Sequence, residues 1–313
     1  MSMITRFFLM ISYLTVMVPL YAKENKKNFD HQKLAAVTKK DVSIIESVES
    51  TRSFISYVKI GGIKYLLKQK KAWSKQSSVI RDALAAWIAK DLGIAHSVCI
   101  ISSKKEFPGK RNMASPAVLL SIAPGKTIRS QPNSKYYHLS LKQRKKIDGI
   151  FSPDRWFTET IVHQMTWHHQ LPIVIALDLF ICNTDRHRGN LFYDPTTDTF
   201  CAIDMDNIFK YNLPAIAITK LKLMIVHKKE FTREEIKALT VMKNTIQFLL
   251  NKYSVDDIIN KLYFFVEQAQ FSNDSKFTAS LKKKIAHHKK IIIESRVSLK
   301  VLVSLLERII RLS

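Results

Sequence analysis

Residues 177–209 have the sequence LDLFICNTDRHRGNLFYDPTTDTFCAIDMDNIF, the most informative segment of the chain. The segment overlaps an apolar run, Ile173–Cys182, whose hydrophobicity predicts a buried element. Two short β-like pieces within 191–203 enclose a turn at Asp194-Pro195, a pattern typical of a β-hairpin. Such a hairpin would bring the polar loop that precedes it and Asp204, which follows it, to one edge of the structure.

Three oxygen-bearing side chains at this edge form a pattern suited to phosphoryl transfer. Asp185 is followed five positions later by Asn190, and the hairpin then ends on Asp204. Phosphoryl transfer depends on Mg²⁺, on positive charge and on a carboxylate that orients the acceptor hydroxyl. Because Mg²⁺ keeps several waters, one carboxylate and one amide oxygen suffice as protein ligands. We therefore expect Asp185 to accept the hydroxyl proton, and Asn190 and Asp204 to bind the metal.

NTDRHRGNLF followed by AIDMD resembles the catalytic loop and the metal-binding aspartate of phosphatidylinositol 3- and 4-kinases. It is also similar to the wider group that includes HipA-like toxin kinases and secreted Golgi-type kinases. Taken singly, Asp185, Asn190 and Asp204 are more often turn or capping residues, so the combination carries the resemblance. The resemblance implies an α+β, bilobal protein-kinase-like fold. It also implies an ATP-dependent kinase that uses Mg²⁺ or Mn²⁺ and phosphorylates an inositol lipid or a protein hydroxyl.

The resemblance extends to the segment IKYLLKQ, where Lys68 matches the strand lysine that contacts the nucleotide phosphates. Lys70 is the competing choice for this role. Asp82, in the next helical segment, stands where these families place a glutamate that pairs with the lysine. Because aspartate is one methylene shorter, the sequence leaves that ion pair open.

Four further positions are implied by the same resemblance. Ser53 closes a glycine-free segment where the phosphate-covering loop belongs. The region around Leu120 and Ile122 would line the adenine through backbone groups. His187, beside Asp185, matches a basic residue that positions the aspartate, or is a packed histidine. The missing glycines and the shorter acid of the ion pair motivate an alternative interpretation, a catalytically impaired pseudokinase that acts as a basic interaction module.

The first part of the chain is predicted to be rich in strands. Five runs have strand character, at 42–48, 54–60, 63–69, 97–102 and 117–122. Gly61-Gly62 joins the second run to the third and predicts a tight hairpin, because both turn positions need positive φ. A helical period over 77–92 ends at Gly93, and Pro124-Gly125 marks a candidate hinge.

The second part of the chain is predicted to be mainly helical from about residue 140 onward. The segments 232–235 (TREE) and 254–257 (SVDD) have the spacing of capping boxes that begin amphipathic helices. The last segment, 276–313, is basic and helical by period. The predicted domains are a kinase-like N-lobe at 41–124 and a helical C-lobe at 125–313, which holds the catalytic and metal-binding loops.

The N-terminus has the pattern of a secretory signal peptide. Arg6 precedes an uncharged stretch, Phe7–Leu20, and Ala22 stands at the predicted cut. The stretch is short for a membrane span, which needs about 20 apolar residues, although an uncleaved anchor or a buried helix is the alternative. We expect a cleaved segment 1–22, a polar linker at 23–40 and export to a compartment that supplies ATP.

The chain is strongly basic, since 50 Lys and Arg residues against 26 Asp and Glu residues give a formal net charge of +24. This excess suits polyanionic partners such as an anionic membrane surface, and equally a well-solvated exterior. No zinc finger, RRM-type aromatic motif or basic zipper is present, which disfavours nucleic acid as a partner. Three cysteines without CxxC spacing disfavour a structural zinc site, and His168-His169 is not expected to bind metal. No feature of the sequence sets the oligomeric state.

Overall fold

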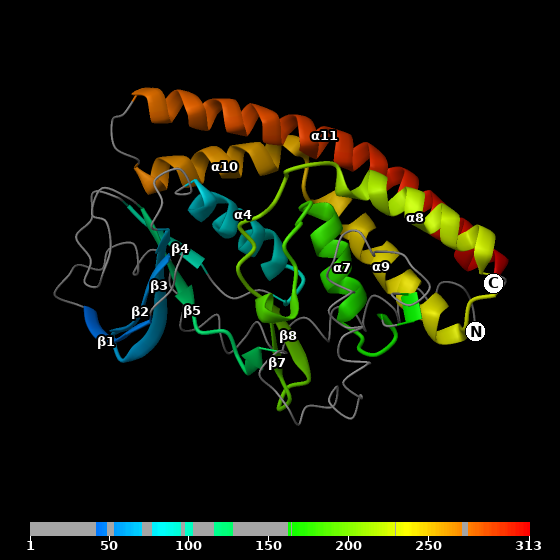
Figure 1. Cartoon of the computed structure of the whole chain (residues 1–313), viewed down its shortest axis with the longest axis horizontal. Helices are drawn as coiled ribbons and strands as arrows, with labels where there is room; N and C mark the ends of the chain where they lie inside the picture. The colour runs from blue at the N-terminus through cyan, green and yellow to red at the C-terminus, as the bar shows by residue number, and fades with distance from the viewer. Residues whose placement is uncertain are drawn as a thin grey trace.

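The computed structural model describes residues 42–48, 53–70, 77–94, 98–102, 116–127, 162–163, 165–228, 230–270 and 275–313. These residues form an antiparallel sheet in the first part of the chain and a mostly helical second part (Figure 1). The predicted α+β class is therefore confirmed, and the arrangement is consistent with the predicted bilobal, kinase-like layout. The predicted signal peptide, the polar linker and most of the predicted phosphate-covering loop lie outside the described residues.

Five strands form the first sheet in the order β1-β2-β3-β5-β4, and every neighbouring pair is antiparallel. The strands are β1 (Val42–Val48), β2 (Ser53–Ile60), β3 (Ile63–Lys70), β4 (Val98–Ile101) and β5 (Ala117–Ser121). Gly61 and Gly62 connect β2 to β3 with φ values of 55° and 86°, which glycine adopts without strain. All five predicted strands are present, and their ends differ from the prediction by one residue at most.

The two faces of this sheet have different neighbours. Helix α4 (Ser78–Lys90) packs against β3, β4 and β5 through its apolar side chains. Because side chains alternate along a strand, Leu66, Lys68 and Lys70 of β3 share one face, and Leu66 packs into the same core as α4. Tyr65 and other side chains of the opposite face form a smaller core of their own. The two lysines therefore lie on the side of the sheet that faces the rest of the molecule.

A second, three-stranded sheet lies at the junction of the two parts. It consists of β6 (Lys126–Thr127), β7 (Leu191–Asp194) and β8 (Thr199–Ala202), in that order. The predicted hairpin at 191–203 is therefore present. Gly125 leads into β6 with φ of 74°, and a Cβ atom there would lie 2.1 Å from the Tyr193 carbonyl oxygen. Only glycine fits this close approach, which lies within the predicted hinge.

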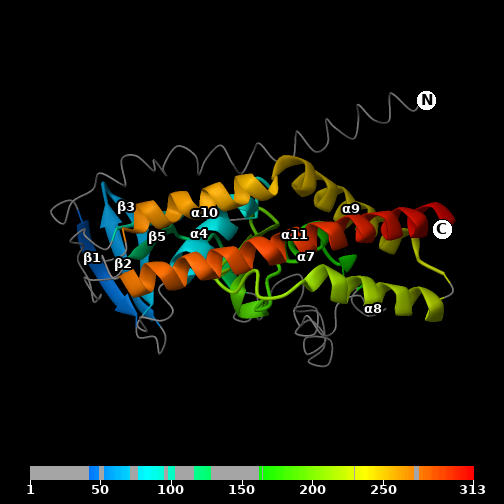
Figure 2. The ribbon, with the colours of Figure 1, turned by 90° about the horizontal axis from the view of Figure 1, so that it is seen from above.

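Five helices are delimited among the described residues of the second part of the chain. They are α7 (Leu171–Phe180), α8 (Leu213–His227), α9 (Arg233–Lys252), α10 (Val255–Ala269) and α11 (Ser275–Leu312). Both predicted capping boxes are confirmed, at Thr232 before α9 and Ser254 before α10, with both reciprocal hydrogen bonds formed. Helix α11 runs along the molecule, with α9 and α10 on one side and α8 on the other (Figure 2). None of the described helices is long and apolar enough to cross a membrane.

Candidate active site

Helix α7 carries one buried carboxylate to the start of the predicted catalytic loop. Asp178 is 1% exposed in an otherwise apolar helix. Its Oδ1 accepts hydrogen bonds from Asn183 Nδ2 at 2.8 Å and from Arg186 Nη2 at 2.9 Å, and its Oδ2 accepts from Arg186 Nε at 2.9 Å. A buried carboxylate needs such partners, because an unpaired charge in the interior is costly. Asp178 therefore braces the loop.

Arg186 links the loop to the segment that follows the hairpin. The residue is 2% exposed, and its Nη1 donates to the carbonyl oxygens of Asn190 at 2.7 Å and Ile203 at 3.3 Å. One guanidinium group thus fixes α7, the loop and the residue before Asp204 relative to one another. No sequence pattern distinguished Arg186 from His187 as the basic residue that positions Asp185, and the resemblance placed that role at His187.

Asp185 and Asn190 lie at the two ends of this loop and are tied together by hydrogen bonds. The Asp185 backbone N–H donates to Asn183 Oδ1 at 3.1 Å, and Asn190 Nδ2 donates to the Asp185 carbonyl oxygen at 3.0 Å. The Asp185 side chain is exposed, and it has no ion-pair partner among the residues that the structure describes. With its amide nitrogen engaged, Asn190 has Oδ1 as the atom that can bind a cation.

His187 is exposed, so the packed-histidine alternative does not hold. Its Nδ1 accepts a hydrogen bond from the Gly189 backbone N–H at 3.0 Å. This contact caps the short 3-10 turn η5 (Arg188–Asn190), which delivers Asn190 to the start of β7. A catalytic role for His187 stays a prediction, while the positioning role expected of a basic neighbour of Asp185 fits the buried Arg186 better.

Asp204 follows β8 in a left-handed conformation with φ of 49°, which is uncommon outside glycine and more frequent for aspartate and asparagine. Its carboxylate is 41% exposed and forms an ion pair with Lys68, while Lys70 Nζ lies 3.9 Å from its Oδ1. Burial alone would raise the pKa of Asp204, but the ammonium groups of Lys68 and Lys70 outweigh burial and lower that pKa. The carboxylate is therefore ionised at neutral pH, the form that binds a cation.

Lys68 lies between two carboxylates from different elements. Its Nζ is 3.6 Å from Oδ2 of Asp82 on α4, in addition to the contact with Asp204. Burial opposes the charge of Lys68, yet Asp82, Asp204 and Asp206 together raise the pKa of Lys68 above its ordinary value. The ion pair that the sequence left open is thus formed. The other oxygen of Asp82 accepts the Met205 backbone N–H at 3.0 Å, so the same carboxylate also contacts the backbone next to Asp204.

The oxygens of Asn190 and Asp204 are the hard donors that Mg²⁺ prefers. The Ile203 N–H donates to the Asn190 carbonyl oxygen at 3.1 Å, so Asn190 and Asp204 come from neighbouring positions of the hairpin. Asp204 also keeps an exposed edge where water or a ligand can complete the coordination. These side chains fit Mg²⁺ or Mn²⁺ bound largely through water and ligand phosphates, and their role as ligands stays a prediction.

Three other residues predicted to contact the nucleotide lie on the first sheet or directly after it. Ser53 begins β2, is buried and pairs with Lys70 of β3. Leu120 is buried in β5, and Ile122 comes directly after β5 with its side chain exposed. Burial leaves Ser53 and Leu120 little side-chain surface for a ligand, whereas Ile122 lies in the connection to β6. Their contacts with a nucleotide stay predictions.

His168, His169 and Asp198 form a cluster whose potential ligand atoms lie within 4.8 Å of one another. His168 already engages both ring nitrogens, since Nδ1 accepts the Gln170 N–H at 3.1 Å and Nε2 faces the Asp198 carbonyl oxygen at 3.1 Å. A metal-bound histidine normally donates from its other nitrogen, which Nδ1 cannot do while it accepts from Gln170. Burial, together with His169, lowers the pKa of His168 to about 4. The geometry favours a neutral, structural His168.

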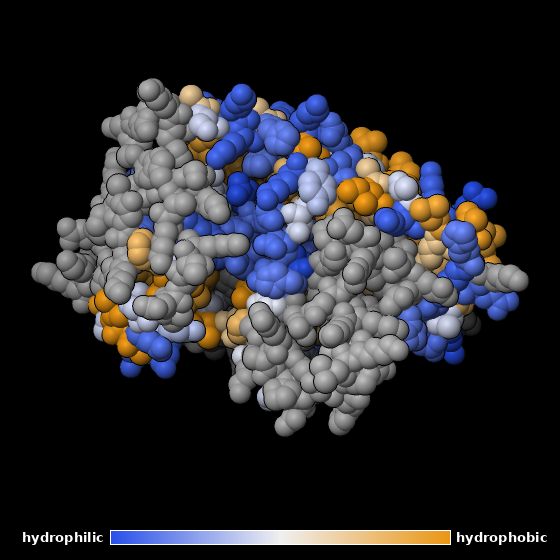
Figure 3. Space-filling view, viewed as in Figure 1, coloured by the Kyte–Doolittle hydropathy of each residue, from blue (hydrophilic) through white to orange (hydrophobic). Residues whose placement is uncertain are grey.

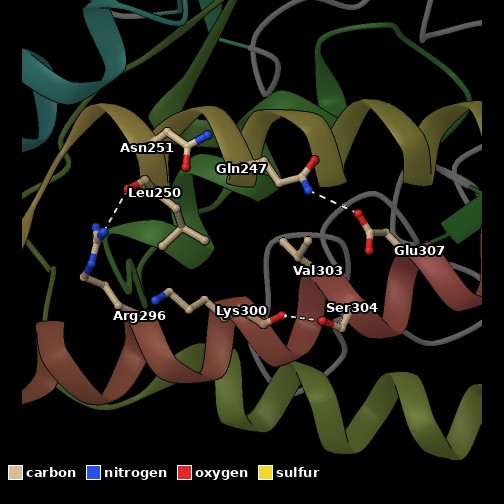
Figure 4. Close-up of a pocket in the computed structure, with 8 residues that line it drawn as sticks. All are labelled: Gln247, Leu250, Asn251, Arg296, Lys300, Val303, Ser304 and Glu307. Atoms are coloured by element: carbon tan, nitrogen blue, oxygen red, sulfur yellow. Dashed lines mark hydrogen bonds between the residues drawn. The ribbon is translucent and has the colours of Figure 1, made fainter.

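A groove of about 440 Å³ lies between α9 and α11 (Figure 4). Arg296 points to the end of α9 and donates to the carbonyl oxygens of Leu250, at 2.8 Å, and Tyr253. Gln247 donates to Glu307 at 3.2 Å across the groove. Arg296 therefore caps the last turn of α9, and Gln247 and Glu307 are partners for each other. None of the residues that line the groove belongs to the site around Asp204.

No protein-family model and no curated protein matches the sequence. Among solved structures, the chain is similar to the Helicobacter pylori proinflammatory kinase CtkA, with 10% sequence identity and a TM-score of 0.45. The match covers 88% of this chain and 98% of that chain. A likeness at this level supports no conclusion about activity, which has to be inferred from the side chains described above.

Proposed function

We propose that this chain is an ATP-dependent phosphotransferase whose active site contains Lys68, Asp185, Asn190 and Asp204. The observation that supports this proposal most strongly is the position of Lys68. A buried strand lysine is paired both with a helix carboxylate and with the carboxylate that follows the β7–β8 hairpin. Asp185 is exposed at the far end of the loop that is hydrogen-bonded to the same hairpin. The four groups together supply what phosphoryl transfer requires.

Each side chain has a distinct part in the proposed reaction. Asp185 orients the acceptor hydroxyl and takes its proton while the oxygen attacks the γ-phosphorus of ATP. The bond from that phosphorus to the β–γ bridging oxygen breaks, and ADP leaves. Lys68, which Asp82 also holds, would donate to the phosphates when it is not paired with Asp204. Asn190 and Asp204 would hold Mg²⁺, which when bound neutralises charge on the phosphate oxygens.

An inositol lipid is the favoured acceptor, and a protein hydroxyl is the alternative. The loop sequence resembles phosphatidylinositol 3- and 4-kinases most closely, and the net charge of +24 suits an anionic bilayer. Helix α8 has no acidic residue, and its Leu223 and Val226 are 53% and 79% exposed. Figure 3 shows apolar patches over α8 and the adjoining half of α11, with hydrophilic residues around them. Such a mixed surface supports contact with a membrane.

The predicted signal peptide extends the proposal to localisation. Cleavage after Ala22 would release the chain into a secretory or extracellular compartment, and the activity proposed here requires ATP there. The mass of the mature protein, isolated after expression with its own N-terminus, tests this point. A chain that keeps residues 1–22 would contradict cleavage.

The test of the proposed activity is transfer of labelled γ-phosphate from Mg·ATP by the full chain. Inositol-lipid vesicles and a generic basic protein are both present, and Asp204→Ala is the matched inactive variant. Label in lipid supports the favoured acceptor, and label in protein alone supports the alternative. No label from a folded chain that still binds Mg·ATP contradicts the proposal and favours a pseudokinase.

A further inference from the structure

Lys70 and Asp206 form a second ion pair beside that of Lys68 and Asp204. Lys70 lies two positions after Lys68, and Asp206 lies two positions after Asp204. Lys70 Nζ is 2.6 Å from Asp206 Oδ2, and both side chains are mostly buried, at 12% and 17% exposed. The proposed reaction gives this second pair no part.

Helix α4 anchors the backbone next to Asp206. Arg81 Nε donates to the Asp206 carbonyl oxygen at 2.7 Å, and Asp82 accepts the Met205 N–H at 3.0 Å. The carboxylate of Asp204, by contrast, is 41% exposed and has the two lysines as its ion-pair partners. The backbone at residues 205–206 is therefore fixed by α4. The carboxylate of Asp204 is exposed enough to exchange a lysine for another cation.

Lys70 is within reach of both carboxylates. Its ammonium group lies 2.6 Å from Asp206 but also 3.9 Å from Asp204 Oδ1. At such distances in a partly buried site, an ammonium group competes strongly with a metal cation for the same carboxylate. If Asp206 did not hold Lys70, the lysine would occupy Asp204 and oppose the approach of a divalent cation.

We propose that Asp206 is a positioning residue that keeps Lys70 off Asp204, so that Asp204 can exchange Lys68 for a divalent cation. This inference rests on the proposed function, because it requires the metal site at Asn190 and Asp204. Under this proposal Asp206 is not a metal ligand, because it stays paired with Lys70 while Asp204 gives up its lysine. Lys68 is then the lysine that donates to the nucleotide phosphates, and Lys70 stays paired with Asp206.

The test measures the Mg²⁺ concentration required for half-maximal binding of a non-hydrolysable ATP analogue to the full chain. Asp206→Asn releases Lys70 onto Asp204, and this concentration should rise about tenfold or more. Adding Lys70→Met to that variant removes the competitor and should restore the wild-type requirement. Lys64→Met, on the exposed end of β3, is the control for the loss of one positive charge.

Each outcome separates the inference from the function on which it rests. An Asp206→Asn variant with the wild-type Mg²⁺ requirement overturns the inference. So does a double variant that stays as impaired as Asp206→Asn, because Asp206 would then be a metal ligand or a structural residue. If Asp204→Asn also leaves the requirement unchanged, the metal site itself is wrong and the proposed function fails with it. Melting of the metal-free proteins verifies that each variant is folded.

Discussion

The buried pair of Arg186 and Asp178 offers a sharp test of how the loop is held. Arg186→Met replaces the guanidinium with an apolar side chain of similar length. The change removes the two hydrogen bonds to Asp178 and the two to the carbonyl oxygens of Asn190 and Ile203. Asp178 would remain in the apolar core with only Asn183 as a side-chain partner.

The expected cost is large because the pair is fully buried. The side chains of Arg186 and Asp178 are 0% and 1% exposed. Removing one partner of such a pair typically destabilises a protein by about 3–5 kcal/mol, because the other charge stays buried and unpaired. Whole domains are stable by only about 5–15 kcal/mol, so the variant should be close to the limit of folding.

Urea unfolding of the full chain measures this cost, and two further variants make the result interpretable. Lys290→Met breaks an exposed i,i+4 pair with Glu294 and should change the free energy of unfolding by less than about 0.5 kcal/mol. The double variant Arg186→Met with Asp178→Leu removes both buried charges and should recover much of the loss. An Arg186→Met variant within about 1 kcal/mol of wild type, or a double variant that is less stable than the single one, would refute this reasoning.

Three further predictions concern other parts of the fold. Burial and the nearby charge of Arg81 lower the pKa of His288 from 6.5 to about 4. Between these two pH values the histidine is protonated in the unfolded state but neutral in the folded state, so the folded state loses stability as the pH falls. His288→Gln should therefore lose less stability than wild type when urea unfolding is repeated from pH 6.5 down to 4, and equal losses would contradict this. Gly125→Ala should lower the melting temperature far more than Gly93→Ala, because both glycines have positive φ but only the first meets backbone atoms; similar shifts would argue against the close approach. Thr232→Ala removes one half of a capping box and should cost about 1 kcal/mol in unfolding free energy, whereas no change would mean that the cap is dispensable.

Local signals were sufficient to predict most of the elements. The Gly61-Gly62 turn, the two capping boxes and the turn at Asp194-Pro195 act over a few residues, so the sequence shows them directly. The spacing of Asp185, Asn190 and Asp204 within one loop and one hairpin belongs to the same class. The order of the strands is different, because β3 pairs with β5 rather than with β4, the next strand along the chain, and no short motif specifies that pairing.

The contacts that complete the candidate site could not be predicted from local patterns. Lys68 meets Asp204 across 136 positions, and Arg81 meets the backbone of Asp206 across 125. Whether Asp82 reaches Lys68 depends on how closely α4 approaches β3, which no residue spacing encodes. Arg186 was missed for a related reason, since burial in three dimensions separates it from the exposed His187 beside it.

The measurement that bears most directly on the proposed chemistry is the transfer rate of Asp185→Ala at saturating Mg·ATP. Any acceptor that takes label from the wild-type chain serves as the substrate. We predict that Mg·ATP binding is nearly unchanged, because no described contact joins the Asp185 side chain to Lys68, Asn190 or Asp204, the groups proposed to hold the phosphates and the metal. The transfer rate should fall by about 10²–10⁴-fold, the usual contribution of a positioned general base. A variant that binds nucleotide and transfers phosphate at the wild-type rate would contradict the assignment of Asp185 as the base.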